Sequence, residues 1–334
     1  MFDKVYIEKR LKDHPRTLSI LEKIKCQSTY YISRYDEVWG KVKKPYLQKR
    51  ESLNLFIAEK KGELVKETPP AYGHGDEKHY FYIHAFNCIY ECQYCYLQGY
   101  FQTPDIVLFI NHEEIISEMQ KLVELPENSN AWFHAGEYSD SLALAHITDE
   151  LSVYFDFFKN NPKAKLELRS KAVNIRPLLQ LEALPNVFVS FTLSSHESGK
   201  KFDTTCPSVK HRLNAIKKLV DHGYRIGLHF DPIIYEDNFQ TAYKDILTEI
   251  NKILPDEQLG YISLGVVRFT KDVYHSVKKH YPDSPFLKQD LIKSFDGKLR
   301  YNRPMRNWIL NTVKDLCIQV GQYQEKKIYF CMED

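Results

Sequence analysis

The sequence predicts an α/β protein whose main unit is a partial (β/α)6 barrel of the TIM type, with extensions at both ends. Two observations support this fold class. Short apolar segments alternate with amphipathic segments about six times between residues 79 and 267, a pattern typical of parallel strands joined by right-handed helical crossovers. The chain of 334 residues is also long enough to bury the core of one large barrel or of two ordinary domains.

Residues 1–75 are expected to form an N-terminal extension, rich in charged and aromatic side chains, with a buried strand at 53–57. Prolines and glycines at 69–75 predict a boundary near residue 75. Residues 76–267 would form the barrel, and residues 268–334 a C-terminal region. The expected barrel strands are 79–86, 131–135, 165–170, 187–193, 225–230 and 261–267, with a further apolar stretch at 106–110. The expected helices are 113–125, 146–159, 175–184, 208–223 and 238–253.

Composition limits the functional classes. The net charge of +2 is close to neutral, so any basic surface for a nucleic acid must be local. We find no apolar segment long enough to cross a bilayer, and the first ten residues are too charged for a signal peptide. Seven cysteines, three of them clustered, argue against a disulfide framework and favour a reducing compartment. We therefore expect a cytoplasmic protein without a membrane partner. Cys26, Cys317 and Cys331 are interpreted as small buried side chains.

The strongest functional signal is a group of three cysteines in a loop after the first expected barrel strand. Cys88, Cys92 and Cys95 have C-x3-C-x2-C spacing, so their thiolates could hold one metal centre. A structural metal site closes its coordination sphere with protein ligands, whereas a site that does chemistry keeps one position open. Soft thiolates suit zinc or an iron-sulfur cluster. A zinc site completed by His84 or His112, and a chance cluster of buried thiols, are the alternatives.

This spacing, with Tyr94 directly before the last cysteine, resembles the signature of the radical S-adenosylmethionine (SAM) superfamily. Residues 92–98, CQYCYLQ, resemble its spore photoproduct lyase branch. The resemblance implies a partial barrel of the radical SAM type and a [4Fe-4S] cluster on the three cysteines. In that superfamily an electron from the cluster splits SAM to a 5'-deoxyadenosyl radical, and the lyases use it to reverse a thymine-thymine adduct in DNA. The resemblance covers the chain from about residue 75 onward.

The resemblance also implies a set of residues that hold the cofactor. The Ala-Gly-Glu sequence at 135–137 is similar to a Gly-Gly-Glu motif whose backbone and carboxylate receive the amino group of SAM. A tight turn with an exposed glutamate is the alternative for this segment. A lysine and a serine that contact SAM in the lyases match positions just past two expected strands. The implied cofactor-binding residues are Ala135, Gly136, Glu137, Ser139, Asp140, Lys171 and Ser195.

Position 137 is where the sequence departs from the lyases. They carry a cysteine there, which gives a hydrogen atom to the product radical, whereas the carboxyl O–H of Glu137 is a poor hydrogen-atom donor. Tyr94 and Tyr96 match two tyrosines proposed to relay the hydrogen atom, so either could be the donor itself; packing against the cluster is the alternative. Cys206 could also substitute, and a buried structural thiol is the alternative there. Glu137, Tyr94 and Tyr96 are the expected catalytic residues.

The C-terminal region carries the residues expected to bind substrate. Arg268 and Lys271 match the lyases, and the segment with Arg300 and Tyr301 resembles their hairpin, whose Arg-Tyr pair wedges into DNA. A basic and aromatic wedge suits the extraction of a base from a duplex, because stacking and phosphate contacts offset the cost of unstacking. A charged surface hairpin is the alternative.

Together these observations predict a radical SAM lyase that repairs DNA photolesions. Its implied partners are damaged duplex DNA and a flavodoxin or ferredoxin-type reductant. A radical SAM reaction on a nucleoside, a tRNA base or a peptide is one alternative, favoured by the near-neutral charge and by Glu137. A zinc or iron-sulfur module that senses redox state or binds nucleic acid without catalysis is the other.

Overall fold

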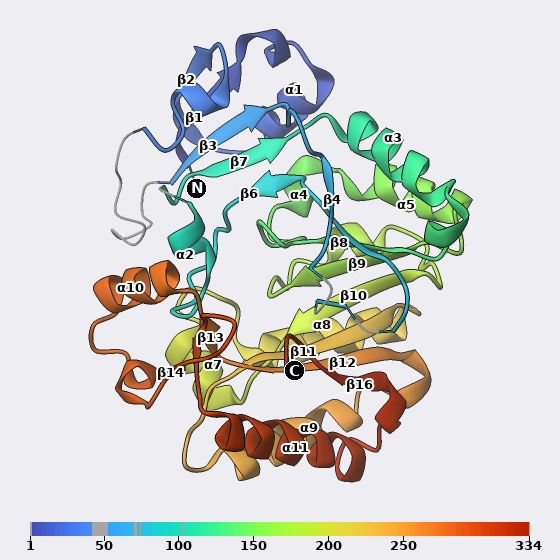
Figure 1. Cartoon of the computed structure of the whole chain (residues 1–334). Helices are drawn as coiled ribbons and strands as arrows, with labels where there is room; N and C mark the ends of the chain where they lie inside the picture. The colour runs from blue at the N-terminus through green and yellow to red at the C-terminus, as the bar shows by residue number, and fades with distance from the viewer. Residues whose placement is uncertain (1, 42–52, 70–71, 74, 102, 334) are drawn as a thin grey trace.

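A computed structural model describes residues 2–41, 53–69, 72–73, 75–101 and 103–333. Its strands form a curled, mostly parallel sheet, a second mostly parallel sheet made largely of N-terminal strands, and a small antiparallel sheet in the C-terminal region. In Figure 1 the N-terminal sheet lies above the larger sheet, and helices cover the outer side of the larger sheet. The fold is therefore α/β, as the alternating pattern predicts.

The larger sheet is the partial barrel. Within the described residues its strand order is β16-β12-β11-β10-β9-β8-β5-β4, and the strands from β5 to β12 run parallel to their neighbours. At one edge β16 adds in parallel to β12, and at the other β4 pairs antiparallel with β5. The strands are β4 (Val65–Glu67), β5 (His79–Tyr82), β8 (Trp132–Ala135), β9 (Lys165–Ser170), β10 (Val187–Thr192), β11 (Arg225–Ile233), β12 (Leu259–Val266) and β16 (Ile328–Phe330). The predicted partial barrel is confirmed.

Most of these strands form from nearly continuous apolar runs, as expected for parallel strands covered on both faces, whereas β9 alternates polar and apolar residues. In β10, five of the six residues of VFVSFT are buried. Most of the helices contribute one apolar face to the same core, whereas Ile20 of α1 and Leu97 of α2 pack into separate clusters. The helices are α1 (Pro15–Lys23), α2 (Leu97–Tyr100), α3 (His112–Val123), α4 (Ala145–Thr148), α5 (Leu151–Asn160), α6 (Arg176–Leu179), α7 (His196–Phe202), α8 (Val209–Asp221), α9 (Phe239–Asn251), α10 (Lys271–His280) and α11 (Arg303–Gln319).

The N-terminal sheet takes strands from both sides of residue 75. Its order is β2-β1-β3-β7-β6, and β6 pairs antiparallel with β7. The single strand expected at 79–86 is therefore two strands, because β5 joins the barrel while β6 joins the N-terminal sheet. The expected boundary near residue 75 does not separate the two sheets, and the division of the chain at residues 75 and 267 stays a prediction. The strands are β1 (Phe2–Glu8), β2 (Cys26–Ile32), β3 (Leu53–Ala58), β6 (Ala85–Phe86) and β7 (Ile106–Phe109).

Two expected helices are shorter than predicted. The helix expected at 146–159 is interrupted at Asp149, whose φ of 53° is left-handed, and so becomes α4 and α5. The helix expected at 175–184 is reduced to α6. The carbonyl groups of Leu178 and Leu181 accept hydrogen bonds from Tyr224 and His222 instead, at 2.7 and 3.0 Å. Contacts with distant residues therefore replace the helical ladder there.

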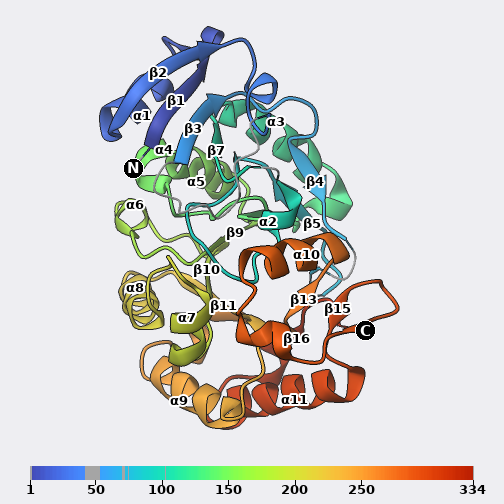
Figure 2. The same ribbon diagram turned by 90° about the vertical axis from the view of Figure 1, so that its left-hand side faces the viewer.

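The C-terminal region packs over the cysteine loop. Figure 2 shows α10 beside α2, and an added Cβ on Gly99 of α2 would lie 2.8 Å from the Cα of Val273 in α10. The small sheet of β13 (Arg268–Phe269), β14 (Ile292–Lys293) and β15 (Leu299–Arg300) follows. Tyr281 donates a hydrogen bond of 2.8 Å to Glu91 in the loop. In the part of the chain that the structure describes, no helix has the length and apolar character needed to span a bilayer.

Candidate active site

A cavity of about 400 Å³ opens where the carboxyl ends of the barrel strands meet the C-terminal region. In barrels of this kind the reactive groups sit at that edge. The three cysteines of the loop all line it, as do most of the residues expected to bind the cofactor. The lining residues that carry the argument are Tyr72, Cys88, Cys92, Tyr94, Cys95, Tyr96, Gly136, Glu137, Ser139, Asp140, Arg169, Lys171, Asp231, Arg268, Lys298 and Cys331.

The cysteine loop runs between β6 and α2 and is held by its own backbone. The N–H of Cys95 donates to the carbonyl of Cys92 at 3.0 Å, and the N–H of Tyr90 donates to the sulfur of Cys88 at 3.3 Å. None of the three cysteines forms a disulfide, and all three are half-buried. Three soft sulfur ligands from one short loop facing one cavity fit an iron-sulfur cluster with an open iron site.

Lys171 stands beside this loop at the end of β9. Its ammonium group lies 3.1 Å from the sulfur of Cys92, 2.6 Å from the hydroxyl of Tyr94 and 3.2 Å from a carboxylate oxygen of Asp203. Burial alone would lower the pKa of Lys171, but the charge of Asp203 raises it well above its usual value. Lys171 is therefore a fixed positive charge at the cysteine loop, where it favours the thiolate form of Cys92.

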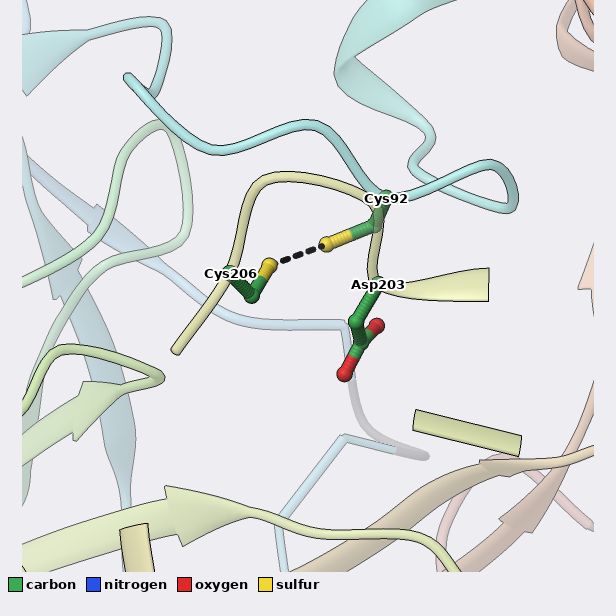
Figure 3. Close-up of side chains that lie close together, drawn as sticks. All are labelled: Cys92, Asp203 and Cys206. Atoms are coloured by element: carbon green, nitrogen blue, oxygen red, sulfur yellow. Dashed lines mark hydrogen bonds between the residues drawn. The ribbon is translucent and has the colours of Figure 1, made fainter. Parts of the chain in front are cut away.

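Cys206 lies beside Cys92 but does not line the cavity. Its sulfur is 3.5 Å from that of Cys92 (Figure 3), and Asp203 completes a compact group of three possible metal ligands within the described residues. The hydrogen bond from Cys206, followed by the nearby charge of Lys171, lowers the pKa of Cys92. The same hydrogen bond raises the pKa of Cys206. The side chain of Cys206 therefore contacts Cys92 and does not face the cavity.

The turn after β8 is built by Gly136 and Asp140. Gly136 has a φ of 98°, and an added Cβ would lie 2.7 Å from the hydroxyl of Ser141 and 2.9 Å from the carbonyl of Arg169. The Asp140 carboxylate accepts hydrogen bonds from the backbone N–H groups of residues 142, 143 and 171, at 2.8 to 3.0 Å, and from the hydroxyl of Ser170 at 2.6 Å. Asp140 is therefore occupied in shaping the turn and in placing the start of Lys171.

Glu137 points into the cavity between two tyrosines. Tyr72 donates to its carboxylate at 3.4 Å, and Tyr96 also bonds it. Burial raises the pKa of Glu137, and the positive charge of Arg169 opposes that shift. The pKa values of Tyr96 and Tyr94 are raised well above the usual value, in both cases first by burial and then by a neighbouring carboxylate, so both phenols keep their hydrogen.

Other residues expected to bind the cofactor lie at or behind the cavity wall. The Ser139 hydroxyl donates to the carbonyl of Asn87, just before the first cysteine, at 2.6 Å. Ala135 is buried in β8 and does not line the cavity. Ser195 is also buried, and its hydroxyl caps the N-terminus of α7 by accepting from the N–H of Ser198 at 3.1 Å. The structure therefore does not bring the Ser195 side chain to the cavity.

The residues expected to bind substrate divide in the same way. Arg268 lines the cavity and makes two hydrogen bonds of 2.8 and 2.9 Å with Asp231, whereas Lys271 lies on the exposed start of α10. Arg300 and Tyr301 are fully buried. The expectation of a surface Arg-Tyr wedge therefore needs correction. The most exposed large apolar side chain of this hairpin is Phe295, 79% of whose surface is accessible, ahead of Ile292 at 50%.

Tyr301 and Arg300 are buried because both are bonded inside the C-terminal region. The Tyr301 hydroxyl donates to Gln289 at 2.5 Å and accepts from the N–H of Tyr235 at 3.0 Å. One guanidinium nitrogen of Arg300 lies 3.2 Å from the Asp296 carboxylate and another 3.5 Å from that of Glu333. The pair thus holds the hairpin to the rest of the region.

Sequence reasoning missed a buried polar network beneath the cavity, centred on Glu167 of β9. Arg169 donates two hydrogen bonds of 3.1 Å to its carboxylate, and His229 of β11 lies 2.8 Å from it. His134 and Tyr261 bond the same carboxylate. Alternate residues of neighbouring strands point the same way, so polar residues at every second position of 165–169 were the available signal. The network fixes Arg169 at the cavity floor.

Most of the chain is similar in sequence to known proteins. A family model described as spore photoproduct lyase matches residues 76–303. A spore photoproduct lyase of Geobacillus sp. (strain Y412MC61) is 25% identical over 213 residues, which are 63% of this chain and 62% of the relative. That of Bacillus subtilis (strain 168) is 23% identical over 286 residues, 83% and 82% of the two chains. The chain thus spans less than two thirds of the Geobacillus relative.

Solved structures agree in fold. A spore photoproduct lyase complexed with dinucleoside spore photoproduct superposes with a TM-score of 0.83 at 21% identity, covering 99% of both chains. A double mutant of that enzyme with bound AdoMet and dinucleoside spore photoproduct gives a TM-score of 0.82 at 21% identity, with the same coverage.

Proposed function

The chain belongs to the spore photoproduct lyase family of radical SAM enzymes, and from this premise we propose that it is a cytoplasmic lyase that repairs a thymine-thymine photolesion in DNA. One observation carries the proposal beyond family membership. The three thiols of Cys88, Cys92 and Cys95 face the same cavity as the turn at 136–140, Lys171 and two tyrosines, at the carboxyl edge of the barrel.

The donor set fits the two cofactors that the family implies. Cys88, Cys92 and Cys95 would hold a [4Fe-4S] cluster, and the glycine turn with Glu137 would receive the amino group of SAM. When bound, cluster and SAM supply the radical that starts the reaction. An external reductant, of the flavodoxin or ferredoxin type, would supply the electron.

The chain's own residues have separate tasks in this proposal. Lys171 places a positive charge beside the cluster thiolates and, through its backbone N–H, is tied to the turn by Asp140. Glu137 accepts hydrogen bonds from Tyr72 and Tyr96 and so holds both phenols at the cavity. A substrate bound in the cavity would exclude bulk water, which would otherwise compete for a reactive intermediate.

Substrate binding would involve the wall made by the C-terminal region. Arg268 and Lys298 place guanidinium and ammonium groups at the cavity, suited to a phosphodiester. Phe295 at the tip of the hairpin between β14 and β15 is an exposed aromatic side chain that could wedge between bases when the lesion is extracted from a duplex. We thus assign to Phe295 the wedge role that the sequence suggested for Arg300 and Tyr301.

Anaerobic turnover tests the proposal directly. The reconstituted protein is incubated with SAM, dithionite and dinucleoside spore photoproduct, and released thymidine units are measured together with 5'-deoxyadenosine. We expect repair by the native protein and by the control variant Cys26→Ala, whose thiol lies in the N-terminal sheet. Cys92→Ala should repair nothing. SAM cleavage by the native protein without any repair would contradict the proposed substrate.

One observation favours a second candidate, a radical SAM reaction on a substrate other than DNA. Glu137 occupies the position of the hydrogen-donating cysteine of the lyases, so the quenching step of the lyases cannot proceed from that residue. Selective binding of lesion-containing duplex over undamaged duplex across a salt series would support the lyase. Equal binding of both duplexes, with SAM cleavage stimulated by a nucleoside or tRNA, would support the second candidate.

A further inference from the structure

The cavity is also lined by a thiol outside the cysteine loop, that of Cys331. Strand β16 adds to the barrel beside β12, and the N–H of Cys331 donates to the carbonyl of Leu264 at 2.8 Å, so the pairing extends one residue beyond β16. Cys331 therefore stands at the carboxyl end of a parallel strand, the position where barrels of this kind carry reactive groups. It lines the cavity together with Glu137 and Tyr96.

The surroundings of Cys331 keep its thiol protonated. Only 6% of its surface is accessible. A guanidinium nitrogen of Arg268 donates to its sulfur at 3.7 Å and favours the thiolate, but this effect is smaller than those of burial and of Asp231. Burial, together with the carboxylate of Asp231, raises the pKa of Cys331 to about 11. At neutral pH the sulfur thus carries the hydrogen that a hydrogen-atom donor must have.

The other thiols outside the loop are less suited to this task. Cys206 contacts the sulfur of Cys92 and does not line the cavity. Cys317 is buried in α11, and Cys26 lies in the N-terminal sheet. Cys331 is the cysteine outside the loop that lines the cavity.

We propose that Cys331 gives the hydrogen atom that quenches the substrate radical, in place of the cysteine that the lyases carry at position 137. This inference rests on the proposed lyase function. After the bond between the two thymines breaks, one thymine is a carbon-centred radical. The S–H bond of Cys331 breaks homolytically and one C–H bond forms, which leaves one unpaired electron on the sulfur.

The balance is restored by phenols at the cavity. Tyr72 and Tyr96 are both bonded to Glu137, and both line the cavity together with Cys331. A phenolic O–H gives its hydrogen atom to the sulfur, and the resulting phenoxyl radical takes back the hydrogen atom that the adenosyl group of SAM removed from the substrate. Each step transfers one hydrogen atom from one group to the next, so these steps need no further oxidant or reductant.

Turnover in D2O tests the proposal, because a thiol exchanges its hydrogen with solvent. The native protein and Cys26→Ala should place deuterium from solvent on the repaired thymine. Cys331→Ala should lower the yield of correctly repaired product at least about tenfold while SAM is still cleaved. Adding Glu137→Cys to Cys331→Ala should restore the yield, since position 137 lines the same cavity.

A labelling experiment gives a readout that does not depend on turnover. Methyl methanethiosulfonate is added to the reconstituted protein without reductant, and modified cysteines are identified by mass spectrometry. Saturating dinucleoside spore photoproduct should protect Cys331 and leave Cys26 unaffected.

Three results separate the possible failures. Unprotected Cys331 would contradict the inference, as would a Cys331→Ala variant with the yield and deuterium content of the native protein. In both cases the proposed function would survive. Absence of repair by the native protein would instead overturn the proposed function, and the inference with it.

Discussion

Glu167 is the most heavily bonded carboxylate beneath the cavity, and it is fully buried. Burial alone would raise its pKa, but Arg169 and His134 lower it well below the usual value. A carboxyl group whose pKa is depressed in the folded state contributes stability above its unfolded pKa of about 4.3, and that contribution is lost as the pH falls further.

We therefore expect Glu167→Gln to lower the free energy of unfolding at neutral pH by about 3 to 5 kcal/mol, because it removes the fully buried charged partner of the half-buried Arg169 guanidinium. The loss relative to the native protein should shrink as the pH falls below about 4. Urea unfolding across pH measures both effects. The control is Glu182→Gln, whose ion pair with Lys159 is exposed and should be worth less than about 1 kcal/mol. A pH-independent difference for Glu167→Gln would contradict the account.

At the residue scale, the sequence predicted site residues that are neighbours in the chain but not those that long-range strand pairing brings together. Cys88, Cys92 and Cys95 lie in one short loop, so their spacing alone predicts a shared centre. Cys331 reaches the same cavity only because β16 pairs with β12, a long-range contact that no sequence pattern near Cys331 indicates. Ser195 was expected at the cofactor because it follows a strand. It also directly precedes a helix, and its hydroxyl satisfies the N-terminus of that helix instead.

The turn after β8 shows how one element positions the site. Gly136 holds a left-handed φ in close contact with Ser141 and the backbone of Arg169. Gly62 has a similar φ of 76° but no atom within 4 Å of an added Cβ. Comparing alanine substitutions at the two glycines therefore distinguishes the effect of backbone strain from that of steric conflict.

Both Gly62→Ala and Gly136→Ala should pay about 1 kcal/mol in backbone strain. Gly136→Ala should also displace the turn, because its Cβ would meet the Arg169 carbonyl at 2.9 Å. We expect SAM affinity to fall by roughly tenfold in this variant, about 1.4 kcal/mol, and to stay unchanged in Gly62→Ala. Calorimetry on the reconstituted protein makes the comparison. Equal SAM affinities in the two variants would remove the turn from the cofactor site.

The hairpin between β14 and β15 makes a separate prediction. Base stacking on an aromatic side chain is worth about 1 to 3 kcal/mol, so Phe295→Ala should weaken binding of lesion-containing duplex by that amount. Affinity for dinucleoside spore photoproduct should not change, because no duplex has to be opened. Leu125→Ala removes another exposed apolar side chain and serves as control. A similar loss for duplex and dinucleoside would show that Phe295 does not act as a wedge.

Helix and strand patterns predicted where the elements lie in the sequence better than which strands pair in a sheet. The alternating pattern located β8 to β12, α3, α8 and α9 to within a few residues, because most of these strands are apolar runs and these helices are amphipathic. It could not assign β6 and β7 to the N-terminal sheet, since sheet membership depends on pairing with β3 and not on local sequence. The small sheet and β16 are too short to produce a clear period.

At the scale of the whole molecule, three parts of the chain meet at one cavity. The barrel supplies Lys171 and the glycine turn, the loop between β6 and α2 supplies the cysteines, and the C-terminal region supplies Arg268 and Cys331. Contacts such as the hydrogen bond of 2.5 Å from Ser284 to Gln93 join the last two. The cavity therefore forms only when the whole chain is folded.

Metal content with spectroscopy tests the central claim most directly. After anaerobic reconstitution we expect about four iron and four sulfide per chain, a reduced cluster visible by electron paramagnetic resonance, and a changed spectrum when SAM is added. Cys92→Ala should lose this signal, and Cys26→Ala should keep it. Zinc in place of iron, or a cluster spectrum that SAM leaves unchanged, would contradict an open iron site on these three cysteines.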